Sequence, residues 1–158
     1  MSCGVALAVS LLLTDPNVAI SAAVPPVAAD APVSVAAEPL FADIVARSGV
    51  LRGEVQGWMA VGVADRADFF SGADFLGFKA RATELAALDM QGHLVLKERG
   101  VDGDLKCILR GIAEDIPVKL GGVESATTPA ERRVALDELA YLLNDNVEVI
   151  TAPPQPEV

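Results

Sequence analysis

The chain has 158 residues, and 52% of them are hydrophobic, which is enough for one folded domain with a single core. Its formal net charge of -10 argues against non-specific binding to nucleic acid or to an anionic membrane surface, because both kinds of binding depend on Lys and Arg neutralising phosphates. A basic partner fits this composition better than an acidic one.

The N-terminal segment has features of an export signal. Residues 3–13 (CGVALAVSLLL) form an apolar run that is long enough for a signal-peptide core but too short to span a bilayer. Small residues suited to cleavage follow, including Ser21-Ala22-Ala23. We therefore predict a signal peptide over residues 1–23 and an extracytoplasmic protein, periplasmic or secreted, without stable membrane insertion. The segment has no Lys or Arg, which leaves a cytoplasmic protein as the alternative.

Two segments at the ends lack the pattern of a folded domain. Residues 24–39 contain proline at four positions and show no apolar period, which indicates a disordered Ala/Pro-rich spacer. Residues 151–158 (TAPPQPEV) resemble this spacer and form a predicted Pro-rich disordered tail. The folded domain is therefore predicted over residues 40–150.

Residues 50–64 fit either a helix or a strand. Apolar residues or glycines alternate there with Arg52, Glu54 and Gln56, as in a half-buried strand. Apolar residues also recur at helical spacing, and in a helix Gly49, Gly53 and Gly57 would share one face that permits close approach of another backbone. We favour a helix, because a Gly-rich strand is weak and no second strong strand is available to pair with it. Self-association through this face is a further option.

A second helix is predicted to begin at Ser71-Gly72-Ala73-Asp74, which resembles a capping box. Its apolar seam extends to about Met90. Gly92 is the expected point of interruption, and Gly100 is the expected end of any continuation through His93.

A third helix follows Asp102-Gly103-Asp104, where acidic residues suit the N-terminal end of the helix dipole. We expect Pro117 to kink or break it, with one or two further turns over residues 118–123.

The last helix has the clearest start, at Thr128-Pro129-Ala130-Glu131, and is predicted to reach about Asn144. We place Val134 among its core positions and Arg132 among its surface positions. The short link before it makes the last two helices antiparallel neighbours. The sequence thus predicts an all-α fold, an irregular bundle of about four helices with a C-terminal helical hairpin.

His93 is the only histidine, and Asp89 precedes it by one helical turn. These two residues are weak candidates for metal ligands, since a stable zinc or di-iron site needs three or four. No cofactor-binding motif or catalytic constellation is present, so we expect no cofactor and favour a protein that is not an enzyme.

Cys107 lies between Lys106 and Ile108, with Arg110 nearby. The basic neighbours would lower the pKa of a reactive thiol, whereas an unpaired cysteine in an oxidising compartment is usually hidden. We expect Cys107 to be buried.

Trp58, Phe69 and Phe70 are weak candidates for contacts with a partner, because aromatic side chains dominate binding hot spots. Packing in the core is the simpler interpretation of all three.

The leading hypothesis for function is a non-catalytic module of the cell envelope that binds a protein or regulates one. The first alternative is a small-ligand carrier or enzyme with a pocket near His93 and Cys107. The second is a structural envelope protein.

Overall fold

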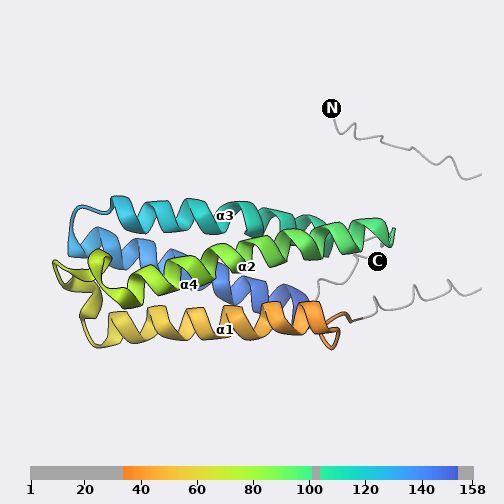
Figure 1. Ribbon diagram of the computed structural model, residues 1–158, viewed down its shortest axis with the longest axis horizontal. Coiled ribbons are helices and arrows are strands. Elements are labelled where there is room, and N and C mark those ends of the chain that lie inside the picture. Colours follow the sequence, from red (N-terminus) through yellow and green to blue (C-terminus); the bar gives the residue numbers. More distant parts are fainter. Residues whose placement is uncertain (1–33, 101–103, 153–158) are drawn as a thin grey trace, which may run out of the picture. The chain divides into compact units, whose positions relative to one another are not determined.

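The computed structural model describes residues 34–100 and 104–152 of the chain (Figure 1). The described elements are α1 (Pro39–Ala60), η1 (Val63–Asp65), η2 (Phe69–Ser71), α2 (Ala73–Glu98), α3 (Leu105–Ser125) and α4 (Pro129–Thr151). Within these ranges there is no strand, which confirms the predicted all-α bundle and its C-terminal hairpin of α3 and α4.

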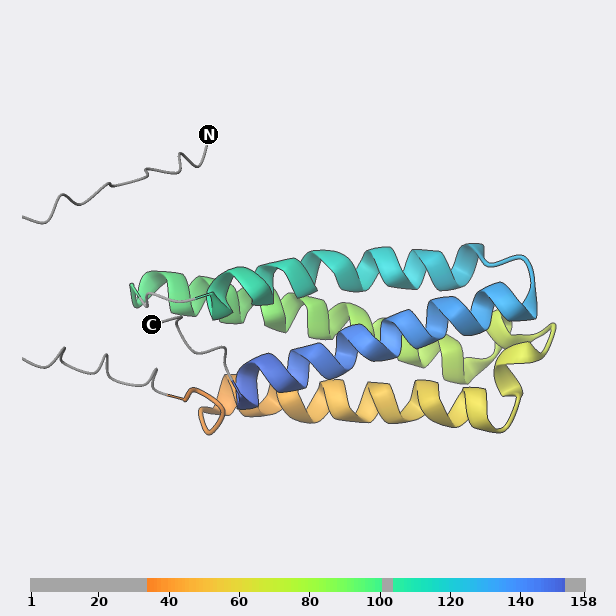
Figure 2. The same cartoon turned by 180° about the vertical axis from the view of Figure 1, so that it is seen from behind.

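The four helices run alternately up and down the bundle, with α1 and α3 on opposite sides (Figures 1 and 2). The helix α1 packs mainly against α4, and α2 packs mainly against α3. Large apolar side chains from all four helices are fully buried along the axis of the bundle. Among them are Phe41, Leu51, Phe78, Leu85, Leu109, Ile116, Leu136 and Leu143.

The ambiguous residues 50–60 belong to α1, so the helical interpretation of this segment is confirmed. Helical spacing places Phe41, Ile44, Leu51 and Val55 on one side, where all four are buried in the core. Upstream, Val35 is buried, and Glu38 accepts hydrogen bonds of 2.9 and 2.8 Å from Arg99. Residues 34–39, which we assigned to the spacer, therefore contribute to the fold. The predicted signal peptide, residues 1–23, lies wholly outside the described residues, and so does the predicted tail from residue 153 on.

The start and the length of α2 differ from the prediction. Gly72 occupies the N-cap without a side-chain hydrogen bond, while the Ser71 hydroxyl donates to the Asp68 carbonyl at 3.0 Å, so the predicted capping box is wrong. The helix continues through Gly92 to Glu98 without interruption. Gly100 follows directly after the C-cap Arg99 and terminates the helix, as predicted, because its φ of 65° is a left-handed conformation that glycine adopts without strain.

Gly92 lies where three helices meet. A Cβ atom at this position would come within 3.2 Å of Leu109 Cδ1, 3.3 Å of Phe41 Cε1 and 3.5 Å of Ile44 Cδ1. Glycine is therefore used here for close packing, and the helix persists because burial of its neighbours outweighs the weak helix propensity of one glycine.

We expect Gly92→Ala and Gly53→Ala to change stability in opposite directions. Gly53→Ala should raise the free energy of unfolding by roughly 0.5–1 kcal/mol, because alanine favours the helix and nothing lies within 4 Å of the new methyl group. Gly92→Ala gains the same propensity but forces apart packed core side chains, for a net loss of about 1 kcal/mol. Urea unfolding of both variants measures the difference, and equal effects at the two glycines would contradict this account.

The expected break at Pro117 does not occur, and α3 runs continuously from Leu105 to Ser125. Loss of the proline amide costs one helical hydrogen bond. The buried residues Ile112, Ile116 and Leu120 continue in register across it, while Pro117 itself is exposed. Burial of this stripe on both sides of the proline holds the two halves in one helix.

The capping box of α4 is confirmed: Glu131 N donates to Thr128 Oγ1 at 3.2 Å, and Thr128 N donates to Glu131 Oε2 at 3.1 Å. Two positions were misassigned, because Val134 is exposed and Arg132 is buried. The true buried stripe, on which Arg132 lies, includes the polar residue Asn146 and continues to Ile150. The helix extends beyond the predicted end at Asn144 to Thr151. No helix within the described residues has both the length and the apolarity needed to cross a membrane.

Candidate functional site

A polar cluster lies at the centre of the bundle, formed by Ser48 of α1, Asp89 of α2 and Asn146 of α4, all with no exposed surface. The Asn146 amide nitrogen donates to Asp89 Oδ1 at 3.0 Å, Asp89 Oδ2 at 2.9 Å and Ser48 Oγ at 3.1 Å. This amide thus ties three helices together through side chains that the apolar pattern alone does not reveal.

The cluster leaves Asp89 in an environment that favours its neutral form. Burial raises the pKa of the Asp89 carboxyl from 3.8 to about 7, against the hydrogen bond from Asn146, which lowers it. Asn146 Oδ1 is buried and accepts no hydrogen bond. Protonation of Asp89 would supply a hydroxyl donor, which a rotated Asn146 amide accepts through Oδ1. The cluster can therefore hold one proton near neutral pH.

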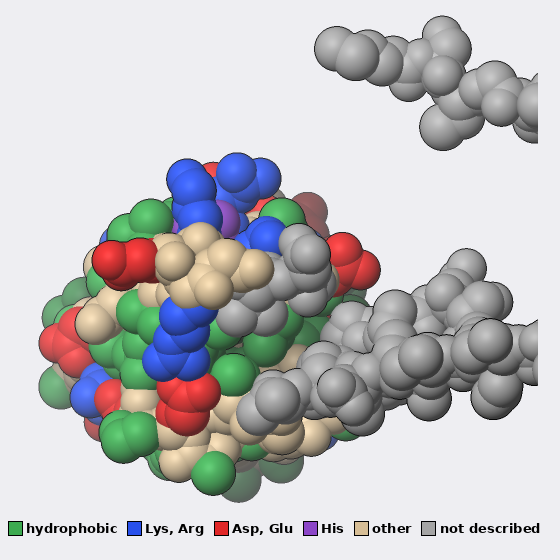
Figure 3. Space-filling model, turned by 90° about the vertical axis from the view of Figure 1, so that its right-hand side faces the viewer, with side chains coloured by type: hydrophobic (Ala, Val, Ile, Leu, Met, Phe, Trp, Pro, Cys, Tyr) green, Lys and Arg blue, Asp and Glu red, His purple; other side chains and the backbone are tan. Residues whose placement is uncertain are grey.

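The candidate metal ligands Asp89 and His93 face different helices. The Asp89 carboxylate faces α1 and α4, whereas His93 Nδ1 lies 2.6 Å from the Lys106 carbonyl oxygen of α3, to which it can donate. Among the described residues no group of three or more His, Cys, Asp or Glu is placed to hold a metal ion. Figure 3 views this end of the bundle and shows both basic and acidic side chains on its surface.

Cys107 is exposed, so the predicted burial of this residue is wrong. The buried side of α3 passes through Leu109, with Ile108 half-buried beside it. Cys107 therefore lies on the side of the helix that faces solvent. Cys107 of α3 thus lies at the surface, whereas His93 of α2 is buried.

The three aromatic candidates belong to one cluster at the end of the bundle where α1 connects to α2. Trp58 packs edge-on against Phe69 with ring centroids 5.3 Å apart, and Phe69 packs against Phe70 at 5.3 Å. Phe69 is buried, while Trp58 and Phe70 are half-buried. Core packing explains Phe69, while part of the Trp58 side chain stays accessible.

Arg132 of α4 holds this aromatic cluster in place. Its Nη1 donates to the carbonyl oxygens of Ala64 at 2.6 Å and Arg66 at 3.0 Å, and its guanidinium lies 4.4 Å from the Phe70 ring centroid. The adjacent Arg133 forms an ion pair with Asp65. Two consecutive arginines of α4 thus bind the segment that connects α1 to α2.

The exposed side of α1 is unusual because none of its exposed positions carries a charge, while the charged residues Asp43 and Arg47 beside it are half-buried and paired with each other. The exposed positions are Pro39, Ala42, Ala46, Gly49, Val50, Gly53, Gln56, Gly57 and Ala60. Each of the other three helices exposes several acidic or basic residues. The glycines Gly49, Gly53 and Gly57 do share one face, as predicted, but within the described residues nothing lies within 4 Å of a Cβ built on any of them. This uncharged α1 face is therefore open to a neighbour from outside the described chain.

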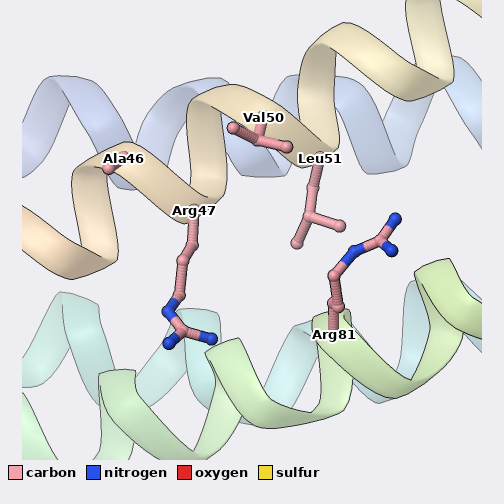
Figure 4. A pocket seen from close by; sticks show the side chains of 5 residues that line it. All are labelled: Ala46, Arg47, Val50, Leu51 and Arg81. Carbon is pink, nitrogen blue, oxygen red and sulfur yellow. The ribbon is translucent and has the colours of Figure 1, made fainter.

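A first hollow of about 170 Å³ borders the uncharged α1 face on its α2 side. It is lined by Ala46, Val50 and Leu51, with Arg47 and Arg81 at its two ends (Figure 4). The arginines reach toward each other's helix, and both are neutralised: Arg47 pairs with Asp43 and Glu84, and Arg81 pairs with Glu54. The walls of this hollow are thus apolar, and the two arginines at its ends are paired with carboxylates.

A second hollow of about 390 Å³ lies on the other side of Arg81, lined by Glu54, Trp58, Ala73, Asp74 and Arg81. Asp74 is exposed and forms no ion pair with the described part of the chain. Together the two hollows form the α1/α2 groove, which has an apolar part at Val50 and Leu51 and an acidic, aromatic part at Trp58 and Asp74.

The sequence identified Trp58 but not the rest of this groove. Val50 of α1 is far in sequence from Asp74 and Arg81 of α2, and no sequence motif links them. No local sequence pattern could therefore have predicted the groove. A comparison of the chain with models of protein families, with curated proteins and with solved structures finds no match.

Proposed function

We propose that this chain is an exported, non-catalytic helical module that binds a protein partner through the uncharged α1 face. The observation that carries the proposal is that no exposed position of α1 has a charge, although the chain as a whole has a formal charge of -10. The centres of protein interfaces are depleted of charged residues, because a charge buried there loses its hydration.

The shape of α1 supports docking of a helix. Its 22 residues extend about 33 Å, long enough for several turns of a partner to pack alongside. Glycine and alanine at its exposed positions leave little side-chain bulk, so a second helix can approach closely. Helix-in-groove recognition places apolar anchors of the partner into hollows beside such a face, and the α1/α2 groove supplies them.

The export part of the proposal rests on the apolar run of residues 3–13 and the small residues that follow it. Mass spectrometry of the protein recovered from its own cells measures the N-terminus. We expect a chain that begins near residue 24, and recovery of a chain with an intact Met1 end contradicts export. The proposed periplasmic or secreted location and the proposed role in the envelope both depend on the outcome of this measurement.

We expect Gly53→Glu to abolish partner binding without unfolding the protein. The change places one carboxylate in the middle of the uncharged α1 face, where the structure leaves open space. The matched control is Gly121→Glu, which adds the same group at an exposed glycine of α3 that also has nothing within 4 Å. Circular dichroism should show that both variants retain the helical fold.

The measurement is quantitative affinity capture with the wild-type chain and both variants as baits. A specific partner should be retained by the wild type and by Gly121→Glu, and reduced at least tenfold with Gly53→Glu. A second copy of the chain counts as such a partner and is detected by sedimentation at increasing concentration. If all three baits retain the same proteins in the same amounts, the α1 face is not the binding surface.

A further inference from the structure

We infer that the partner presents an amphipathic helix that carries an aliphatic side chain and, about two turns away, a lysine or arginine. This inference rests on the proposed function and specifies the chemistry of the segment that the α1/α2 groove accepts. Its basis is the pairing of one apolar hollow with one acidic, aromatic hollow on the same side of α1.

The first hollow suits an aliphatic or small aromatic side chain. Its volume of about 170 Å³ is close to the size of cavities that hold a benzene molecule, roughly 150 Å³. Ala46, Val50 and Leu51 supply apolar walls, and Val50 is otherwise exposed to water. Filling this hollow removes apolar surface of both partners from water.

The second hollow suits a cation. Asp74 offers a carboxylate without an ion pair in the described part of the chain, and Glu54 adds a second carboxylate shared with Arg81. The half-buried Trp58 ring lines the same hollow and can accept a guanidinium or ammonium group on its face.

The charges along the groove also favour a basic segment over an acidic one. The carboxylates of Glu54 and Asp74 line the second hollow, and only Glu54 is paired there, with Arg81. The charge of Arg47 at the first hollow is balanced by Asp43 and Glu84, which pair with it outside the lining. The net charge of -10 of the whole chain attracts such a segment at long range.

The distance between the hollows sets the spacing of the two side chains. On α1 the first hollow is lined from Ala46 to Leu51 and the second from Glu54 to Trp58. Their centres are therefore separated by roughly seven residues of helix, or about 11 Å. A partner helix lying along α1 in either direction reaches both hollows with residues about seven positions apart.

The test uses the full chain and three synthetic helical peptides of alanine and glutamine. The first carries a leucine and an arginine seven positions apart, the second a leucine and a glutamate, and the third a serine and an arginine. We expect the first peptide to bind at least tenfold more tightly than either of the others, measured by fluorescence anisotropy at physiological salt. Equal binding of the first and third peptides, or of the first and second, would overturn the inference, as would binding of none.

Variants of the chain show whether the first peptide occupies the groove. Asp74→Asn removes the free carboxylate and should weaken binding about tenfold, whereas Asp115→Asn, at an exposed position of α3, should change it less than twofold. Ala46→Phe should block the first hollow, while Val118→Phe on the exposed side of α3 should not. Equal effects of Asp74→Asn and Asp115→Asn on peptide binding would mean that the peptide responds only to the net charge of the chain, which contradicts the inference.

Failure of this inference is distinguishable from failure of the proposed function. If Gly53→Glu removes a captured partner but the peptides bind without the expected preference, the α1 face is the binding surface and the inferred partner chemistry is wrong. If Gly53→Glu has no effect on capture, the proposed function fails regardless of how the peptides behave.

Discussion

Replacing Asp89 with asparagine is expected to make the protein more stable at pH 8, by about 4 kcal/mol, although it removes a buried hydrogen-bonded carboxylate. The buried carboxyl has a pKa of about 7 in the folded protein against a usual 3.8, so its ionised form is disfavoured by folding. An asparagine has nearly the same shape, carries no charge, and can donate to the unsatisfied Asn146 Oδ1 while accepting from the amide nitrogen of Asn146.

The direction of the pH dependence follows from the raised pKa. Below about pH 4 both the folded and the unfolded chain hold the proton, and the contribution of Asp89 to stability is fully present. As the pH rises through about 7, the unfolded chain has already lost its proton and the folded chain must lose it too. A shift of this size corresponds to about 4 kcal/mol of stability lost across that interval.

Urea unfolding of the wild type and of Asp89→Asn at intervals from pH 4 to pH 8 measures the effect. The two proteins should have similar stability near pH 4 and diverge as the pH rises, while the control Asp115→Asn should follow the wild type throughout. If the wild type is the more stable protein at pH 8, the ionised Asp89 is stabilised by the cluster and our assignment of its pKa shift is wrong.

Comparison with a variant is needed because other carboxyl groups act in the opposite direction. Hydrogen bonds from Arg99, Arg133 and Thr127 lower the pKa values of Glu38, Asp65 and Glu131, respectively. Stability from these three groups is present above their usual pKa and is lost as the pH falls through their lowered values. Since the groups are unchanged in Asp89→Asn, the difference between the two proteins isolates Asp89.

Replacing Arg132 with alanine is expected to lower the free energy of unfolding by about 2–4 kcal/mol. The change leaves the Ala64 carbonyl oxygen without its donor and removes one of the two hydrogen bonds that the Arg66 carbonyl accepts. It also removes the guanidinium that covers the Phe70 ring. Trp58, the only tryptophan, packs against Phe69 in the same cluster, so its fluorescence should change as the connection between α1 and α2 loosens.

Arg132→Met is the matched comparison, because methionine fills much of the same space but donates no hydrogen bond. We expect it to recover part of the loss and to remain less stable than the wild type by about 1–2 kcal/mol. Equilibrium unfolding monitored by circular dichroism and by tryptophan fluorescence measures both variants. Wild-type stability of Arg132→Met would show that the two hydrogen bonds contribute nothing and that the arginine acts by bulk alone.

The sequence by itself determined the helical class of the fold and most of its elements. Regular apolar stripes at 3.6-residue spacing predict α2, α3 and α4, because each such stripe must be buried to offset the entropy lost on folding. Local signals also determined the start of α4 at Thr128 and the end of α2 at Gly100, since capping depends on residues within one turn.

Only the tertiary structure decided the features that depend on several helices together. Pro117 and Gly92 look like helix breakers in sequence, but neighbouring helices bury the residues around them and keep both helices continuous. The burial of Arg132 and Asp89 depends on partners 68 and 57 residues away, Ala64 and Asn146. The α1/α2 groove also depends on tertiary structure. The packing of the two helices determines its shape, and the periodicity of apolar residues in either helix alone does not predict it.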